Sequence, residues 1–306
     1  MQFQESQKLR AMAETKFREM QDEYFRRRWP NAQAWLSAYN STAQQDACLA
    51  AKADCPGSGQ WLLDDDRFKK WFHPTFCSTP LLWLNGIPGA GKTVLVSTVI
   101  EAIQALSNKN PADKQVRLAY FYCKQGDASR NNFVSVAKGL LSHLVKGNSD
   151  LILHIYEQGN LQSGEAILLD RSMTKALLDV AVVDSQKITY VIIDGLDECE
   201  PDERKEICSW FINRVNQLGK GDFGVLRCLF ASQEDRYTKR DLGAVPSIKM
   251  FPINTRDDIK RYVMFWEKKI EDKHGKLDPS GAASSLADLI LSATQGDQYS
   301  LRSLIL

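Results

Sequence analysis

The chain of 306 residues is 43% hydrophobic and 25% charged, and its formal net charge is +1 at pH 7. A balance this close to neutral excludes a strong electrostatic drive toward nucleic acid or anionic lipid, and the length allows one large or two modest domains. The apolar runs are too short to span a membrane, and the first residues lack the apolar core of a secretory signal. We therefore expect a cytoplasmic globular protein.

The cysteine pattern agrees with that expectation. The seven cysteines include no C-x-x-C pair and their number is odd, which argues against a structural zinc site and against a secreted disulfide framework. We expect reduced thiols. The four histidines are scattered without the spacing of metal ligands.

Charged residues dominate the start of the chain. The first 29 residues place Leu9, Met12, Met20 and Tyr24 at spacings compatible with one helical face, and Pro30 is predicted to close that helix. Residues 32–53 are predicted to form a short helix and a loop. An amphipathic helix of this kind packs against something, which predicts protein partners or self-association through this segment.

The next segments lead into a distinctive motif. A turn at residues 56–59 precedes a helix predicted over 64–72, and the apolar run 81–84 predicts a buried strand. Residues 86–93 then spell G-I-P-G-A-G-K-T, which fits the phosphate-binding pattern G-x-x-x-x-G-K-[ST]. Residues 93–106 follow with apolar side chains at helical spacing, so strand, loop and helix stand in the order that such a loop requires.

The residue types of this loop match the chemistry of phosphate binding. Glycines let the backbone curl so that successive N–H groups point at an anion beside the N-terminus of the following helix. Lys92 is expected to reach the β- and γ-phosphates, and the Thr93 hydroxyl is expected to bind Mg²⁺. The predicted nucleotide-binding residues of this segment are Gly86, Gly89, Ala90, Gly91, Lys92, Thr93 and Val94.

Strands and helices alternate from this point on. Further strands are predicted at 116–122, 188–193, 225–231 and 247–251, and further helices at 132–145, 150–157, 173–181 and 202–218. Strands separated by helices imply right-handed crossovers and a parallel sheet covered on both faces. The predicted fold class is α/β: a three-layer αβα sandwich of the P-loop NTPase type, with a mainly parallel five-stranded sheet, N-terminal helices before it and the start of a helical domain after it.

An acidic residue ends the third of these strands. The run I-T-Y-V-I-I at 188–193 is uninterrupted, as in a strand buried on both faces, and Asp194 follows it directly. Open parallel sheets bind their ligands at the carboxyl ends of the strands. Asp194 is therefore the expected partner of Mg²⁺, together with Thr93.

These motifs together resemble the NACHT nucleotide-binding module, and most closely the nephrocystin-like version common in fungal signalling proteins. Four segments carry the resemblance: P-G-S-G-Q-W-L-L at 56–63, L-L-W-L-N-G-I-P-G-A-G-K-T at 81–93, Y-F-Y-C at 120–123 and V-I-I-D-G-L-D-E-C at 191–199. The resemblance implies a signal-transduction ATPase of the STAND class, in which exchange of ADP for ATP with Mg²⁺ permits assembly, here of the fungal incompatibility or innate-immunity type.

The resemblance also assigns residues and boundaries. In related ATPases a glutamate follows the Mg²⁺ aspartate, but this chain has Gly195 there, so slow hydrolysis is expected with either Asp197 or Glu198 positioning water. The family's Ser-Arg pair after the fourth strand is Ser232-Gln233 here, so Ser232 is an expected nucleotide contact and recognition of the γ-phosphate is expected to weaken. The implied divisions are a helical segment at 1–55, a nucleotide-binding domain at 56–254 and a truncated helical domain at 255–306.

Other functions stay open at this point. The segment 108–111 fails the N-K-x-D pattern that reads guanine, which favours ATP over GTP without excluding GTP. A nucleotide-binding scaffold or truncated remnant without hydrolysis is one alternative. A small-molecule kinase using the same loop is another, and it would need a second substrate for turnover.

Overall fold

A five-stranded parallel sheet organises the chain. The computed structural model describes residues 12–13, 15–16, 20, 23, 26–53, 56–73, 77–109, 116–146, 148–161, 167–184, 187–219 and 222–274. The strands are β1 (Leu81–Asn85), β2 (Val116–Tyr122), β3 (Ile188–Asp194), β4 (Leu226–Ser232) and β5 (Ser247–Lys249). All pairings are parallel, and the order across the sheet is β2-β3-β4-β1-β5.

The register brings the ends of distant strands together. Asn85 at the end of β1 pairs with Ser232 at the end of β4, and Asp194 at the end of β3 pairs with Ala231. Because the strands are parallel, the loops that follow β1, β2, β3 and β4 all leave the sheet at the same edge. This edge holds every site residue that the sequence predicts.

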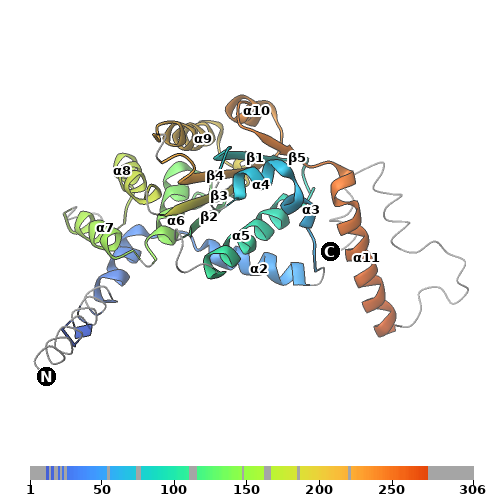
Figure 1. Cartoon of the computed structure of the whole chain (residues 1–306), viewed down its shortest axis with the longest axis horizontal. Coiled ribbons are helices and arrows are strands. Elements are labelled where there is room, and N and C mark those ends of the chain that lie inside the picture. The colour runs from blue at the N-terminus through green and yellow to red at the C-terminus, as the bar shows by residue number, and fades with distance from the viewer. Residues whose placement is uncertain are drawn as a thin grey trace, which may run out of the picture.

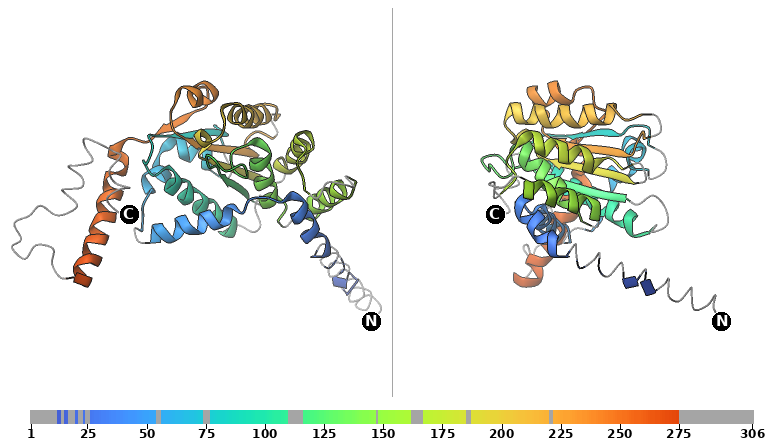
Figure 2. Two further views of the ribbon diagram at one scale, coloured as in Figure 1. Left: turned by 180° about the vertical axis from the view of Figure 1, so that it is seen from behind. Right: turned by 90° about the vertical axis from the view of Figure 1, so that its left-hand side faces the viewer.

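Helices cover both faces of the sheet (Figures 1 and 2). One face carries α2 (Ser41–Ala53), α3 (Gln60–Asp64), α4 (Asp66–Phe72) and α5 (Lys92–Lys109). The other carries the helical residues 26–36 with α6 (Phe133–Leu144), α7 (Ser149–Leu161), α8 (Arg171–Val182), α9 (Pro201–Asn216) and α10 (Arg236–Leu242). The last described helix, α11 (Pro252–His274), follows β5 and stands beside the sheet (Figure 1).

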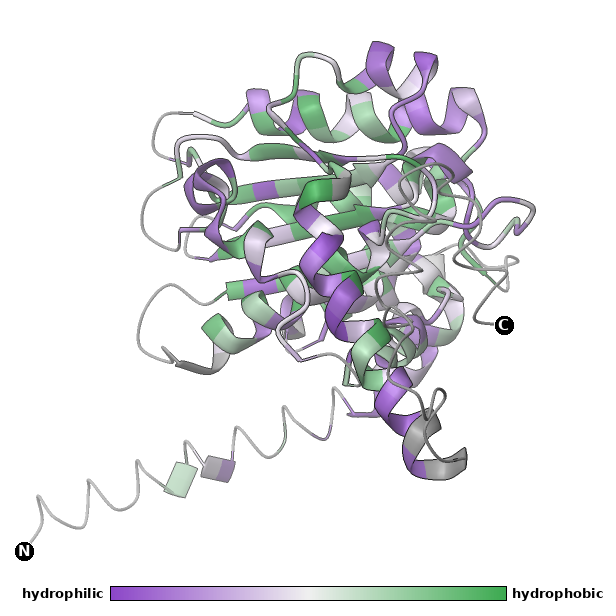
Figure 3. Ribbon diagram, turned by 90° about the vertical axis from the view of Figure 1, so that its right-hand side faces the viewer, coloured by the Kyte–Doolittle hydropathy of each residue, from purple (hydrophilic) through white to green (hydrophobic). Residues whose placement is uncertain are grey.

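The alternation of side chains along the strands creates two cores. In β2, Phe121 faces the α6 side while Tyr120 and Tyr122 face the α5 side, and all three are buried. β3 and β4 are buried along their whole length. Figure 3 shows hydrophobic residues predominating along the strands, with hydrophilic residues on the outer helices. This confirms the predicted three-layer α/β sandwich with a five-stranded parallel sheet.

The N-terminal part departs from its predicted elements. Pro30 lies inside the helical residues 26–36 and does not close a helix. The lost backbone hydrogen bond is offset by burial, because Ala32, Trp35 and Leu36 on the following turns pack into the core. Of the segment 32–53, predicted as a short helix and a loop, residues 41–53 form α2. Leu9 and Tyr24 of the predicted apolar face lie outside the described residues.

The helix expected over 64–72 is α4, which begins at Asp66, and a separate short helix, α3, precedes it. Asp65 lies between α3 and α4 with extended backbone, and its carboxylate accepts hydrogen bonds from the N–H groups of Arg67 and Phe68. The aspartate therefore acts as an N-cap that starts a new helix. Within the described parts of the chain, no helix is both long enough and apolar enough to cross a bilayer.

Candidate functional site

The loop between β1 and α5 has the backbone that its glycines predict. Gly89 and Gly91 have φ angles of 73° and 88°, a conformation that favours glycine. A Cβ atom added at either position would meet no atom within 4 Å, so the space in front of the loop is open. Gly86 is closely packed, since its Cβ would lie 3.0 Å from Cβ of Met250. The loop is thus anchored at its start and accessible at its bend.

Lys92 folds back over this loop. Its Nζ donates to the carbonyl oxygens of Gly86 at 2.9 Å and Ile87 at 2.8 Å. Burial lowers the pKa of Lys92, while the negative charges of Asp197, Asp194 and Glu198 oppose that shift. The ammonium therefore sits beside three carboxylates and rests on two carbonyls of its own loop.

Thr93 and Asp194 meet across 101 positions of sequence. The Thr93 hydroxyl donates to Oδ2 of Asp194 at 2.7 Å. Asp194 is 5% exposed, and burial raises its pKa to about 6, against the lowering effects of the Thr93 hydrogen bond and the Lys92 charge. A hydroxyl and a carboxylate are the oxygen donors that Mg²⁺ prefers, and a nearby cation offsets the cost of burying the carboxylate. The donor set therefore fits Mg²⁺.

A short acidic turn follows β3. Gly195 has a φ of 72°, and a Cβ there would lie 3.1 Å from the carbonyl oxygen of Cys123, so glycine suits both the backbone and the space. The 3-10 turn η1 (Leu196–Glu198) comes next. Oδ1 of Asp197 accepts from the N–H of Gln233 at 2.9 Å, and Oε2 of Glu198 accepts from the N–H of Gln125 at 3.1 Å. The two acids thus hold the loops that follow β4 and β2.

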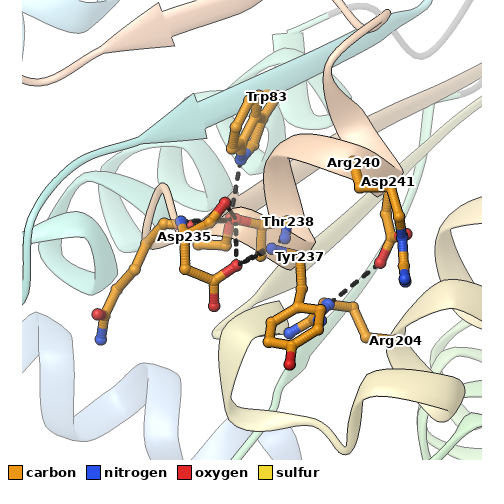
Figure 4. Close-up of polar contacts among 9 residues, drawn as sticks. Trp83, Arg204, Asp235, Tyr237, Thr238, Arg240 and Asp241 are labelled. Carbon is orange, nitrogen blue, oxygen red and sulfur yellow. Dashed lines mark hydrogen bonds and ion pairs between the residues drawn. The ribbon is translucent and has the colours of Figure 1, made fainter.

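Ser232 follows Ala231, the register partner of Asp194, but its side chain bonds other groups. Its side chain is fully buried, its Oγ accepts from Nε1 of Trp83 at 2.8 Å, and it donates to the carbonyl of Gln233 at 3.0 Å. The same carbonyl accepts from Thr238, which forms a capping box with Asp235 at the start of α10 (Figure 4). The Ser232 hydroxyl is therefore part of an internal brace, whereas Arg236 is exposed at the first position of α10.

The structure brings together most of the predicted residues and adds some that the sequence did not indicate. The loop, Lys92, Thr93, Asp194, Asp197 and Glu198 converge at one edge, and Val94 is partly exposed beside them. Gln125 and Gln233 were missed because they act through backbone N–H groups, which every residue except proline carries. Met250 was missed because it lies far from Gly86 in the sequence, and only the folding of the sheet brings the residue after β5 to the loop.

The amino-acid sequence of the chain is similar to those of known proteins. Residues 57–233, more than half of the chain, match the family model described as Nephrocystin 3, N-terminal. The vegetative incompatibility protein HET-E-1 of Podospora anserina is 33% identical over 149 residues, which are 46% of this chain and 10% of the relative. The chain therefore spans a small part of that relative's length.

Solved structures with a similar arrangement are more distant. Cdc6p from Pyrobaculum aerophilum aligns with a TM-score of 0.43 and 18% identity, over 70% of this chain and 50% of that chain. The ORC2 protein of Aeropyrum pernix aligns with a TM-score of 0.38 and 12% identity, over 68% of this chain and 51% of that chain.

Proposed function

The chain belongs to the nephrocystin 3 N-terminal family, and from that premise we propose that it binds ATP with Mg²⁺ and works as a slow, nucleotide-controlled signalling switch of the NACHT class. The relative HET-E-1 is a vegetative incompatibility protein, which supports a signalling role of the fungal incompatibility type. A γ-phosphate with its metal offers different contacts to two arrangements of a chain, as a population shift requires.

One observation carries the proposal: the two motifs that nucleotide chemistry needs are in direct contact. The Thr93 hydroxyl donates to Asp194 at 2.7 Å, and Lys92 bonds two carbonyls of the same loop, which is open at Gly89 and Gly91. Each of these bonds joins groups that a bound ligand can take over. A phosphate can replace the carbonyls that hold Lys92, and a magnesium ion can bridge Thr93 and Asp194.

The residues then have distinct roles. The N–H groups of Gly86, Gly89, Ala90 and Gly91 and the ammonium of Lys92 would hold the phosphates, while Thr93 and Asp194 would hold the metal, the latter through its retained waters. The metal would neutralise charge on the β- and γ-phosphates. Val94, partly exposed on the first turn of α5, would flank the rest of the nucleotide.

For the water-positioning role we favour Asp197 over Glu198. Asp197 is less exposed than Glu198, and its negative charge opposes the lowering of the Lys92 pKa by burial. Glu198 is exposed and its Oε2 is held by the loop after β2. Asp197→Asn is then expected to slow hydrolysis more than Glu198→Gln, with phosphate release as the measurement.

Recognition of the γ-phosphate is expected to be weak, because Gln233 stands where the family has arginine. An amide lacks the charge and the bidentate fork of a guanidinium. We expect ATP and ADP to bind within about tenfold of each other, a difference of about 1.4 kcal/mol, and Gln233→Arg to increase the preference for ATP. Competition between the two nucleotides for a fluorescent analogue measures both ratios, and a strong ATP preference in the unmodified protein would contradict this expectation.

The decisive experiment compares the unmodified protein with Lys92→Ala and Asp194→Ala. Calorimetry with ATP, ADP and GTP, each with and without Mg²⁺, measures affinity and base preference, and phosphate release measures turnover. We expect ATP to bind more tightly than GTP, Lys92→Ala to abolish most binding and Asp194→Ala to remove the Mg²⁺ dependence. Identical behaviour of all three proteins would exclude the proposed function.

A second candidate is a nucleotide-binding scaffold without hydrolysis. It is favoured by the hydrogen bonds that engage both Asp197 and Glu198 with backbone N–H groups, since each leaves less carboxylate for a water. Tight Mg²⁺-dependent binding with no phosphate release over hours would select this candidate over the switch that turns over.

We further propose the arrangement of the chain around this site. Residues 56–254 would form the nucleotide-binding unit, residues 255–306 would begin a helical domain, and residues 1–55 would bind protein partners or other copies of the chain in the cytoplasm.

A further inference from the structure

Arg130 makes several hydrogen bonds within the loop between β2 and α6, residues 123–132. The carbonyl of Arg130 accepts from the N–H of Lys124 at 3.2 Å, and its own N–H donates to the carbonyl of Asp127 at 2.8 Å. Its Nε also pairs with Oδ2 of Asp127 at 2.7 Å. Hydrogen bonds from Ser129 and the Arg130 guanidinium lower the pKa of Asp127 to about 2, so this carboxylate is charged at any physiological pH.

The same loop holds the acidic turn at the candidate site. The N–H of Gln125 donates to Oε2 of Glu198, next to Asp197 in η1. The N–H of Cys123 donates to the carbonyl of Asp194 at 2.9 Å, and Cys123 also packs against Gly195. The conformation of residues 123–132 therefore sets the position of the segment from Asp194 to Glu198.

Arg130 also reaches the N-terminal part of the chain. Its guanidinium donates to the hydroxyl of Tyr39 at 3.1 Å and lies 4.5 Å from the centroid of the Tyr39 ring. That ring packs edge-on against Phe121 of β2 at 6.2 Å between centroids. Just upstream, Trp35 and Leu36 are buried in the core, and the carbonyl of Trp35 accepts from the N–H of Leu168. Tyr39 is thus fixed by the docked helical residues 26–36.

We propose that Arg130 is a positioning residue that couples the docking of the N-terminal segment to the acidic turn of the nucleotide site. Tyr39 and Asp127 contact the Arg130 guanidinium, and Arg130 stabilises the loop 123–132. The backbone N–H of Gln125 in that loop donates to Glu198, which fixes the turn that carries Asp197. This inference rests on the proposed nucleotide binding. A partner that displaces residues 26–39 releases one side of Arg130, and the acidic turn then loses its orientation while the phosphate loop does not.

The physical size of such coupling is modest. The Arg130 side chain is 12% exposed, so its ion pair and its contact with Tyr39 are partly shielded from solvent. Coupling between two sites in proteins is commonly 5- to 150-fold, and by linkage it acts in both directions for binding. Hydrolysis should respond to Tyr39 because the acidic turn is held through Arg130, an effect on kcat to which this reciprocity does not apply. The exchange of residues 26–39 should respond to nucleotide by the same factor, less than threefold, by which their docking changes the Kd.

The test uses two substitutions on this path and one matched control outside it. Tyr39→Ala and Arg130→Ala remove the contact from either side, while Tyr156→Ala removes a separate aromatic–arginine contact, that of Arg28 in the helical residues 26–36, at 5.0 Å. We expect Tyr39→Ala and Arg130→Ala to lower kcat of phosphate release about tenfold with the Kd of Mg-ATP changed less than threefold, and Tyr156→Ala to match the unmodified protein.

A second readout does not need turnover. Hydrogen exchange of residues 26–39 is measured with and without a non-hydrolysable ATP analogue plus Mg²⁺, and we expect the change seen in the unmodified protein to vanish in Arg130→Ala. Arg130→Lys keeps the charge without the fork and should restore part of kcat. Tyr39→Phe, which removes only the hydroxyl, serves if the alanine variants do not fold, and it should lower kcat about threefold.

Several outcomes overturn the proposal. The first is that Arg130→Ala has the same kcat and the same nucleotide-dependent exchange as the unmodified protein; Tyr39→Phe takes its place if the alanine variants do not fold. The second is that Tyr156→Ala loses as much kcat as Tyr39→Ala. If the unmodified protein itself binds no nucleotide, the proposed function fails and this inference fails with it. If nucleotide binds normally and only the coupling is missing, the proposed function stands alone.

Discussion

Two polar regions at the same edge of the sheet use their hydrogen bonds for different purposes. At the phosphate loop, Lys92 bonds carbonyls of its own loop and Thr93 bonds Asp194, in front of open space. At the junction of β4 and α10, the buried Ser232 hydroxyl accepts from the Trp83 indole, and the exposed Asp235 caps the helix (Figure 4). The residue types are similar, but only the first region lets a ligand replace what it bonds.

The second region also contains a buried ion pair. Nε of Arg204 on α9 lies 3.3 Å from Oδ2 of Asp241 on α10, with the two side chains 3% and 4% exposed, and Tyr237 covers the guanidinium (Figure 4). Charges this well buried depend on each other, because neither can return to water without unfolding. The comparison therefore predicts that the first region controls binding while the second controls stability.

The largest effect is expected when one partner of the Arg204–Asp241 ion pair is removed. Arg204→Ala leaves the Asp241 carboxylate buried, with the exposed Arg240 as its remaining ion-pair partner among the described residues, and we expect a loss of about 3 kcal/mol in the free energy of unfolding. Arg240→Ala, which removes the exposed partner of the same carboxylate, should cost less than about 1 kcal/mol. Urea unfolding measures both. Equal losses, or a loss of nucleotide affinity in folded Arg204→Ala, would contradict the division between the two regions.

The next effect compares two lysines that both bond backbone carbonyls, the half-buried Lys92 and the buried Lys138. Lys92→Ala should weaken Mg-ATP binding about 100-fold, or about 2.7 kcal/mol, and change the unfolding free energy of the nucleotide-free protein by less than about 1 kcal/mol. Lys138, whose Nζ donates to the carbonyl of Leu168 at 3.1 Å on the far face, provides the control. Lys138→Ala should lower stability and leave nucleotide affinity unchanged, as titration and thermal melting of both variants will show.

Local sequence patterns predicted the elements that carry these two regions. The strand expected at 116–122 is β2, and β3 ends at Asp194 as expected. Continuous apolar runs and the helical period are local properties, which is why these elements were found. The strand order is not local, because β1 pairs with β4 across more than a hundred positions. The sequence alone therefore left the contact between Thr93 and Asp194 as an expectation.

Ser232 shows where a usable signal was present. The resemblance assigns it to the nucleotide, and that assignment stays a prediction. Cys228, Phe230 and Ser232 alternate along β4 and share one face of the sheet, the face that also holds Trp83, so the Ser232 hydroxyl meets the indole. The backbone contacts of Gln125 and Gln233 had no such signal, because no residue type marks an N–H group.

A smaller effect tests the cost of burying Asp194 without its metal. Its raised pKa means that the unfolded chain releases this proton before the folded chain does, so rising pH lowers stability between about 4 and about 6 and not above. Asp194→Asn removes this cost, and we expect nucleotide-free Asp194→Asn to melt about 2–4 °C higher than the unmodified protein at pH 7.5. The same variant should lose the stabilisation that Mg-ATP gives the unmodified protein. A lower melting temperature without nucleotide would show that Asp194 is part of the scaffold.

The smallest effect tests whether Ser232 acts in nucleotide binding or in the stability of the junction between β4 and α10. Ser232→Ala leaves the buried Trp83 N–H without its acceptor and should cost about 1 kcal/mol of unfolding free energy, whereas Mg-ATP affinity should stay within twofold. Trp83→Phe removes the same bond from the other side, so the double variant should cost less than the sum of the two single variants. A tenfold loss of ATP affinity in Ser232→Ala would return this hydroxyl to the nucleotide site. It would also mean that the turn from Ser232 to Asp235 rearranges when ligand binds, because the hydroxyl is fully buried without it.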